Sequence, residues 1–219
     1  MLRYLSVLAL ALLFSSCNSN KSNANSCYYD DGSKKPIVVL APMLDSTSYD
    51  VPWSLSEEFS LAIKTDLEKK GSFYFMPEMN FEVSLRENPF GNNLNWVKQN
   101  FKPSEFVVFV ELVEHEDVPV AKTVKDPSSI PAFRKNAANL NMAARIRIVD
   151  IRKDEPVIVL QEMIKNSYYM ANTIDEVDYT VTTWGSEKYQ NTPMEIAHRE
   201  LIGMIKERIS EYIQLAKTR

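Results

Sequence analysis

The densest group of ionisable side chains in the sequence is the run from Glu114 to Asp117, in which His115 stands among three carboxylates. Carboxylates and imidazoles hold hard metal ions and perform acid–base catalysis. The run directly follows the strongest strand pattern of the chain, and side chains along a strand alternate between its two faces. We therefore expect these four side chains not to converge. A hydrolase with a metal or acid site near Glu114–Asp117 is kept as the alternative function.

A second candidate pairs Glu195 with His198, one helical turn apart, as in half of a di-iron site. The complete site needs a second such motif and two further carboxylates, and the sequence has no second motif. We therefore interpret the two residues as polar side chains on the exposed face of a helix. The sequence also lacks a G-x-S-x-G or S-x-x-K nucleophile motif. We predict no catalytic residue, no metal ligand and no cofactor, and expect that the protein is not an enzyme.

Aromatic and acidic side chains gather in an irregular segment, residues 168–190, which follows a long loop at 118–139. Loops that carry tyrosine and tryptophan are typical of protein interfaces. We predict that the two segments form a partner-binding surface, with Tyr179 and Tyr189 as exposed anchors. The residues expected to set the orientation of the partner are Asp175, Glu176 and Asp178. The alternative is that the rings cover an open sheet face, and we prefer it for Trp184.

Composition excludes several classes of protein. The chain has 219 residues, a net charge of -4 and only 5 glycines. Phosphate-binding loops need glycines at close spacing, and no two of these glycines are close enough. Nucleic-acid binding favours a basic face, so we expect no nucleic-acid partner.

The beginning of the chain is typical of an export signal. Arg3 precedes an apolar run from Tyr4 to Phe14, too short to span a bilayer but suited to the core of a signal peptide. The run ending Leu-Phe-Ser-Ser-Cys17 resembles a bacterial lipobox, which implies cleavage before Cys17 and lipid attachment to its thiol. We predict a signal peptide at 1–16 and a lipidated, flexible tether at 17–34. Cys27 would be a lone thiol in an oxidising compartment, which suggests intermolecular pairing; we prefer the alternative, a tolerated and solvated residue of the tether.

The remaining residues, 35–219, are predicted to form a single domain. Capping boxes at Ser54–Glu57 and Thr192–Glu195 each precede apolar residues at helical spacing, and Gly71 suits the end of the first helix. Continuous apolar runs indicate buried strands, and alternation around Arg152–Glu155 indicates a hairpin. The expected strands are 37–41, 72–76, 105–113, 140–151 and 156–168, and the expected helices are 54–71, 94–101 and 192–216. The predicted fold is therefore α/β (α+β), with a mixed sheet of about five strands and two or three helices.

This order of elements behind a lipidated tether resembles a periplasmic α/β domain found in three proteins. They are the curli-secretion lipoprotein, the lipoprotein activator of penicillin-binding proteins, and the amino-terminal domain of TolB. The residues that carry the resemblance are Ile37–Met43, Glu105–Val110 and Arg145–Asp150. The channel-forming members carry extra transmembrane hairpins, and here the only good hairpin is needed by the sheet itself, so we expect no pore.

The resemblance implies a lipoprotein on the periplasmic face of the outer membrane, because Asn18 carries no inner-membrane retention signal; the inner membrane stays possible. We expect a non-enzymatic binding or envelope-assembly module. Its partners would be the membrane, through Cys17, and an envelope protein. The alternative is a periplasmic hydrolase.

Overall fold

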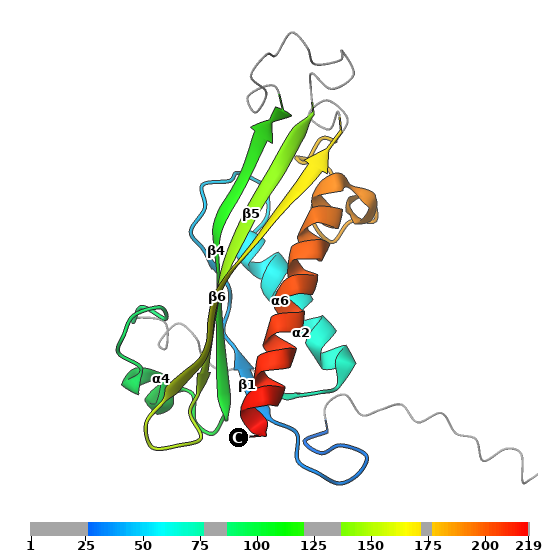
Figure 1. The fold of residues 1–219 in the computed structure, drawn as a ribbon. Helices are drawn as coiled ribbons and strands as arrows, with labels where there is room; N and C mark the ends of the chain where they lie inside the picture. Colours follow the sequence, from blue (N-terminus) through cyan, green and yellow to red (C-terminus); the bar gives the residue numbers. More distant parts are fainter. Residues whose placement is uncertain (1–25, 77–86, 121–136, 172–176, 219) are drawn as a thin grey trace, which may run out of the picture.

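The computed structural model describes residues 26–76, 87–120, 137–171 and 177–218. Cys17 and the predicted signal peptide lie outside these ranges, as do Asp175 and Glu176. The elements run in the order β1 (Ile37–Leu40), β2 (Leu44–Asp45), α2 (Leu55–Lys70), β3 (Tyr74–Phe75), α4 (Asn95–Asn100), β4 (Phe106–Pro119), β5 (Ala138–Asp150), β6 (Val157–Met170), the 3-10 turn η3 (Tyr189–Asn191) and α6 (Pro193–Lys217) (Figure 1).

The strands form one mixed sheet in the order β3-β1-β4-β5-β6, and β2 pairs with β4 beyond the end of β1. β1 is parallel to both β3 and β4, whereas β4, β5 and β6 are antiparallel. In the described part of the chain this gives six strands and three α-helices, so the predicted α/β class is confirmed. The predicted strand 105–113 is longer than expected, because β5 continues to pair with β4 as far as Pro119.

α2 and α6 lie side by side on one face of the sheet (Figure 1). Each helix begins as its capping box predicts: the Ser54 hydroxyl accepts from the Glu57 amide at 3.1 Å, and the Thr192 hydroxyl accepts from the Glu195 amide at 3.1 Å. α2 ends at Gly71, whose φ of 67° is left-handed, a conformation that glycine adopts without strain. The apolar stripes of both helices therefore cover the same sheet face and form the main core, which includes Phe59, Ile63, Leu201, Ile205 and Ile209.

A smaller apolar cluster lies on the opposite face, where α4 covers β1, β4 and the end of β5. Trp96 and Phe101 of this region pack against Phe109 of β4, with ring centroids 5.7 and 5.9 Å away. Farther along, the same face of β4–β6 carries polar or exposed side chains such as Glu116 and Lys165. The sheet is thus covered by helices along one face and by α4 over only one end of the other.

Arg147 attaches the segment before α4 to this second face. Its buried guanidinium donates to the carbonyls of Pro89, Phe90 and Gly91, at 3.0, 2.9 and 2.5 Å. The Gln161 amide oxygen on β6 accepts from Arg147 Nε at 2.8 Å. Because the guanidinium is planar and carries five donors, one side chain satisfies all these acceptors at once.

Residues 27–34 fold back as a turn against the domain instead of belonging to a free tether. Tyr28 bridges to Lys34, and the Tyr29 hydroxyl donates to the Ser72 carbonyl at 2.7 Å. The Lys217 ammonium, at the end of α6, donates to the Lys34 carbonyl at 2.8 Å. In the described part of the chain, residues 27–34 therefore pack against the domain that follows them.

The fold has two distinct ends. One end carries the 27–34 turn, the β5–β6 turn and the last turn of α6 (Figure 1). The other end carries the end of β4, the start of β5, the end of β6 and the first turns of α6. We call them the tether end and the distal end. Among the described helices, none is long and apolar enough to cross a membrane.

Candidate functional site

The core between α2, α6 and β4 contains a cluster of ionisable side chains, which we call the buried polar network. Its centre is Glu58, which lies in the first turn of α2 between the buried residues Leu55 and Phe59. One carboxylate oxygen, Oε1, accepts from the Tyr189 hydroxyl at 2.7 Å and lies 2.8 Å from His198 Nδ1. The other oxygen, Oε2, accepts from the Trp53 indole nitrogen at 2.7 Å. Glu58 is therefore fully engaged although it is buried.

The network continues from His198 on α6 to His115 on β4. The two Nε2 atoms lie 2.8 Å apart, and the ring planes are inclined by 72°. A hydrogen bond between two ring nitrogens holds one proton, so one imidazole donates and the other accepts. Both rings are buried, and Phe59 packs against His198 with ring centroids 4.9 Å apart. Three elements distant in sequence are thus joined by one hydrogen-bonded chain.

A bulge in β4 directs His115 into this core. Before the bulge, the even-numbered residues Val108, Val110 and Leu112 face the helices. The register shifts between Leu112 and Glu114, so His115 and Asp117 face the helices after it. Asp117 accepts from the Tyr49 hydroxyl at 2.8 Å, and the Tyr49 ring lies 4.0 Å from the His115 ring.

The environment shifts the pKa values of the network. Burial raises the pKa of Glu58, but the hydrogen bonds from His198, Tyr189 and Trp53, together with the nearby imidazole charge, outweigh burial and hold it below its ordinary value. Burial, reinforced by His198, lowers the pKa of His115 to about 3. Glu58 therefore carries its charge inside the core, whereas His115 is neutral at ordinary pH.

A carboxylate bonded to an imidazole is an arrangement that can move protons in catalysis. Here the second imidazole nitrogen faces another imidazole instead of an open site. A groove of about 280 Å³ passes over the network and is bordered by Trp184, Glu195 and Arg199, yet Glu58 and His198 remain buried in its wall. In the described ranges, no group of three or more His, Cys, Asp or Glu side chains is placed to hold a metal ion.

The structure separates the side chains of the Glu114–Asp117 run, as predicted. His115 and Asp117 face the helices, and Glu114 and Glu116 lie on the opposite face of β4. Glu195 and His198 were expected on the exposed face of the helix. This is wrong for His198, which is buried and bonded to Glu58. Glu195 is partly buried, and its Oε1 accepts from Arg199 at 3.0 Å.

The predicted exposed anchors also need correction. Tyr189 is buried beneath Trp53, with ring centroids 5.3 Å apart, because its hydroxyl is bonded to Glu58. Tyr179 is partly buried and packs against the main core. Trp184 packs against the same core, in agreement with the preferred interpretation. Asp178 is exposed and binds the amide and hydroxyl of Thr180, so it closes a local turn.

The described ends of the two predicted interface segments lie together at the distal end. The Val120 amide donates to the Ala137 carbonyl at 2.9 Å across the ends of the long loop, and Asn139 pairs with Tyr169 where β6 ends. Tyr168 packs on the core whereas Tyr169 is exposed on the other face, as strand alternation predicts. Val181 is also exposed in the segment that follows β6.

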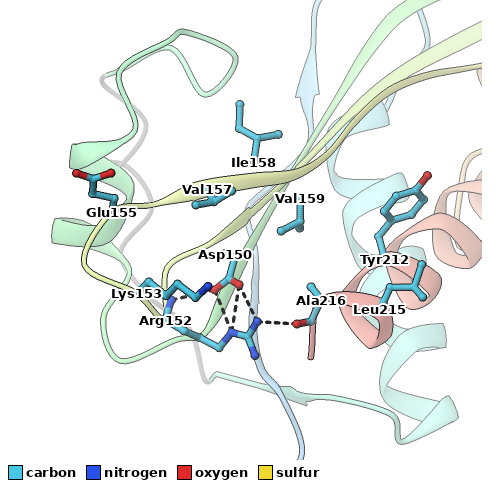
Figure 2. Close-up of a pocket in the computed structure, with 10 residues that line it drawn as sticks. All are labelled: Asp150, Arg152, Lys153, Glu155, Val157, Ile158, Val159, Tyr212, Leu215 and Ala216. Carbon is cyan, nitrogen blue, oxygen red and sulfur yellow. Dashed lines mark hydrogen bonds and ion pairs between the residues drawn. The ribbon is translucent and has the colours of Figure 1, made fainter. Parts of the chain in front are cut away.

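A second groove, of about 290 Å³, lies at the tether end between β6 and α6 (Figure 2). Val157 and Val159 of β6 and Leu215 of α6 supply apolar walls, whereas the Ile158 side chain points to the other side of β6. Between the strand and the helix, Arg152 pairs with Asp150 at 2.7 Å and donates to the Ala216 carbonyl at 2.7 Å. The guanidinium thereby ties the β5–β6 turn to the last turn of α6.

Fold and site together define a mixed-sheet α/β protein whose ionisable core connects two helices to the sheet. The chain belongs to a family of unknown function, DUF7499, which matches residues 24–217. No curated protein matches the sequence.

Several solved structures are similar to this chain. A hypothetical protein, CT253, from Chlamydia trachomatis has 23% identity and a TM-score of 0.65, covering 83% of this chain and 99% of its own. Lipoprotein GNA1162 from Neisseria meningitidis has 13% identity and a TM-score of 0.39, with coverages of 83% and 99%. Protein XCC0632 from Xanthomonas campestris, of family DUF330, has 5% identity and a TM-score of 0.49, with coverages of 84% and 90%. At such identities, similarity concerns the fold alone.

Proposed function

We propose that the protein is a lipid-anchored envelope lipoprotein that binds a protein partner at its distal end and catalyses no reaction. The observation that carries this proposal is that the described ends of both segments lie at the distal end, with Tyr169 and Val181 exposed there. Binding residues tend to lie on such segments when a rigid scaffold supports them. The anchor would be Cys17, in the outer membrane of a Gram-negative cell, and the partner an envelope protein.

The side chains best suited to catalysis, those of the buried polar network, are better placed for a structural role. Glu58, His198 and His115 are buried and are joined by hydrogen bonds, and the second imidazole nitrogen of His198 faces His115 instead of the groove that passes over them. Their bonds join α2, α6 and β4, so they hold the scaffold beneath the distal end. The exposed tyrosine at 169 replaces the buried Tyr189 as the proposed anchor of the interface.

Site-specific photo-crosslinking tests the interface. A benzophenone amino acid would replace Tyr169 or Val181 in the full-length protein, in the cells that produce it. Leu61 on α2 is the matched control, because its side chain is 52% exposed against 46% for Tyr169. We expect a discrete protein adduct from positions 169 and 181 and none from position 61. The same adduct from all three positions, or none from 169 and 181, would contradict the proposed interface.

The anchor is tested separately by Cys17→Ala. Acyl chains contribute about 0.8 kcal/mol for each buried methylene, so the lipidated protein should stay with the membrane in high salt. The variant should appear in the soluble fraction, and the wild-type protein should carry the mass of attached lipid. Wild-type protein that is soluble without detergent and carries no lipid would refute the anchor but leave the interface test intact.

A further inference from the structure

The tether end of the domain carries an unusual share of the exposed apolar side chains. The described residues include eight large hydrophobic side chains that are clearly exposed, and four of them lie at this end: Tyr28, Val157, Ile158 and Leu215. The exposed fractions are 55% for Tyr28, 50% for Val157 and 50% for Leu215. Val157 and Leu215 line the groove of Figure 2, the Ile158 side chain points to the other side of β6 at the same end, and Tyr28 belongs to the 27–34 turn.

We propose that the exposed side chains of Tyr28, Val157, Ile158 and Leu215 together form an apolar surface at the tether end, and that this surface rests on the lipid bilayer that holds the Cys17 anchor. The inference depends on the lipid anchor of the proposed function and concerns a different end of the domain from the partner interface. The chain leaves the folded domain at the 27–34 turn, which the Lys217 ammonium joins to the end of α6. The apolar surface and the exit of the tether are therefore neighbours.

The length of the tether limits how far this end can move from the membrane. An extended chain spans at most about 3.6 Å per residue, so the ten residues from Cys17 to Cys27 can reach about 36 Å. Such a short connection gives the tether end a high effective concentration at the lipid surface. A small apolar surface is then enough to keep the domain docked, although it would not bind a membrane by itself.

The chemistry of this end favours a lipid interface. Tyrosine is typical of the boundary between lipid and water, and Tyr28 and Tyr212 both lie here. The charges nearby are balanced: Arg152 is paired with Asp150, Lys98 lies 3.5 Å from Asp154, and the 27–34 turn carries Asp30 and Asp31 near Lys34 and Lys217. We therefore expect docking by apolar contact, with little dependence on anionic lipid or on salt.

Docking of the tether end would fix the direction in which the domain presents its distal end. With the tether end on the bilayer, the distal end faces away from it, because the two ends lie at opposite ends of β4–β6. Tyr169 and Val181 would then point into the periplasm, where a partner can reach them. Docking thus converts a freely rotating domain into one with a fixed direction of presentation.

Depth-dependent fluorescence quenching tests this inference. The lipidated full-length protein would carry a small fluorescent amino acid at Val157 or Leu215 and be placed in phosphatidylcholine vesicles with brominated acyl chains. Leu61 and Met163 are the matched controls, since they are 52% and 44% exposed but lie away from the tether end. We expect at least threefold stronger quenching at positions 157 and 215 than at the controls, unchanged by high salt or by adding phosphatidylglycerol. Each variant is checked for an unchanged thermal unfolding curve.

The outcomes separate the two proposals. Protein that floats with the vesicles but shows equal quenching at all four positions overturns the docking surface and leaves the anchor standing. Protein that does not float overturns the anchor and the docking surface with it. A double variant, Val157→Ser with Leu215→Ser, should keep flotation but lower the quenching of a probe at Ile158 to the control value. Unchanged quenching in that variant would also overturn the surface.

Discussion

Replacing Glu58 with glutamine should destabilise the protein strongly, because this side chain holds the centre of the buried polar network. The carboxylate accepts from the Trp53 indole and the Tyr189 hydroxyl and contacts His198 Nδ1. An amide has one oxygen, so the substitution places an NH₂ group against at least one of these donors. The loss of a charged acceptor and the new donor–donor contact both raise the free energy of the folded state.

The expected magnitude follows from these contacts. A hydrogen bond to a charged group contributes about 1.5–3 kcal/mol, and a buried donor left without its acceptor costs about 1–3 kcal/mol. The glutamine oxygen can still accept from one side of the network, so we place the loss for Glu58→Gln at about 3 kcal/mol. For a domain of this size, each kcal/mol lowers Tm by about 2–4 °C, giving a decrease of about 6–12 °C.

Urea and thermal unfolding of the full-length protein, followed by circular dichroism, would measure the loss. Glu57→Gln is the matched control, since Glu57 is the preceding residue in the same turn of α2 and its side chain is exposed. The control should change stability by less than about 0.5 kcal/mol. If Glu58→Gln were as mild as the control, the network would not stabilise the fold, and its role would have to be sought elsewhere.

Two further predictions concern the core. The folded protein excludes a proton from His115, whose pKa is lowered to about 3, whereas the unfolded chain takes one near pH 6.5. The free energy of unfolding should therefore fall as the pH drops from 6.5 toward 3, by up to about 1.4 kcal/mol per pH unit. In urea unfolding measured across that pH range, His115→Gln should reduce the slope of this free energy against pH. An equal slope in the variant would contradict this. Ile205 is fully buried in α6, so Ile205→Ala should cost about 2–5 kcal/mol in the same assay, while Leu61→Ala, at an exposed site, should be nearly neutral; equal losses at the two sites would mean that α6 does not complete the core.

The elements that were predicted well are those with local signals. Ser54, Gly71 and Thr192 mark helix ends through hydrogen bonds or backbone conformations within a few residues, so the bounds of α2 and α6 follow from the sequence. The hairpin β5–β6 follows from alternation around a polar turn. β2 was missed because Leu44–Asp45 is extended only through its pairing with β4, a contact distant in sequence.

The buried polar network was missed for two different reasons. Glu58 and His198 do stand at helical spacing within apolar stripes, between Leu55 and Phe59 and before Leu201, and this spacing was a usable signal. His115 gave no such signal. Continuing the alternation of Val108, Val110 and Leu112 places Glu114 inside and His115 outside, and only the bulge reverses this order. The burial of Tyr189 depends on Glu58, which is 131 residues away in sequence.

The contact between Arg147 and the carbonyls of residues 89–91 has a consequence for how the protein opens. Arg147 holds the segment before α4, and Lys98 of α4 donates to the carbonyls of Lys153 and Asp154 in the β5–β6 turn, so we expect α4 and the segment before it to exchange amide hydrogens as one cooperative unit. Release of this unit would leave α2, α6 and the main core in place. It would also uncover Val107, Phe109 and Val149, an apolar strip on a sheet that is otherwise polar on that side. A partly opened protein would thus be prone to aggregate before it is globally unfolded. The hydrogen bonds of Arg147 lower the population of this partly opened state.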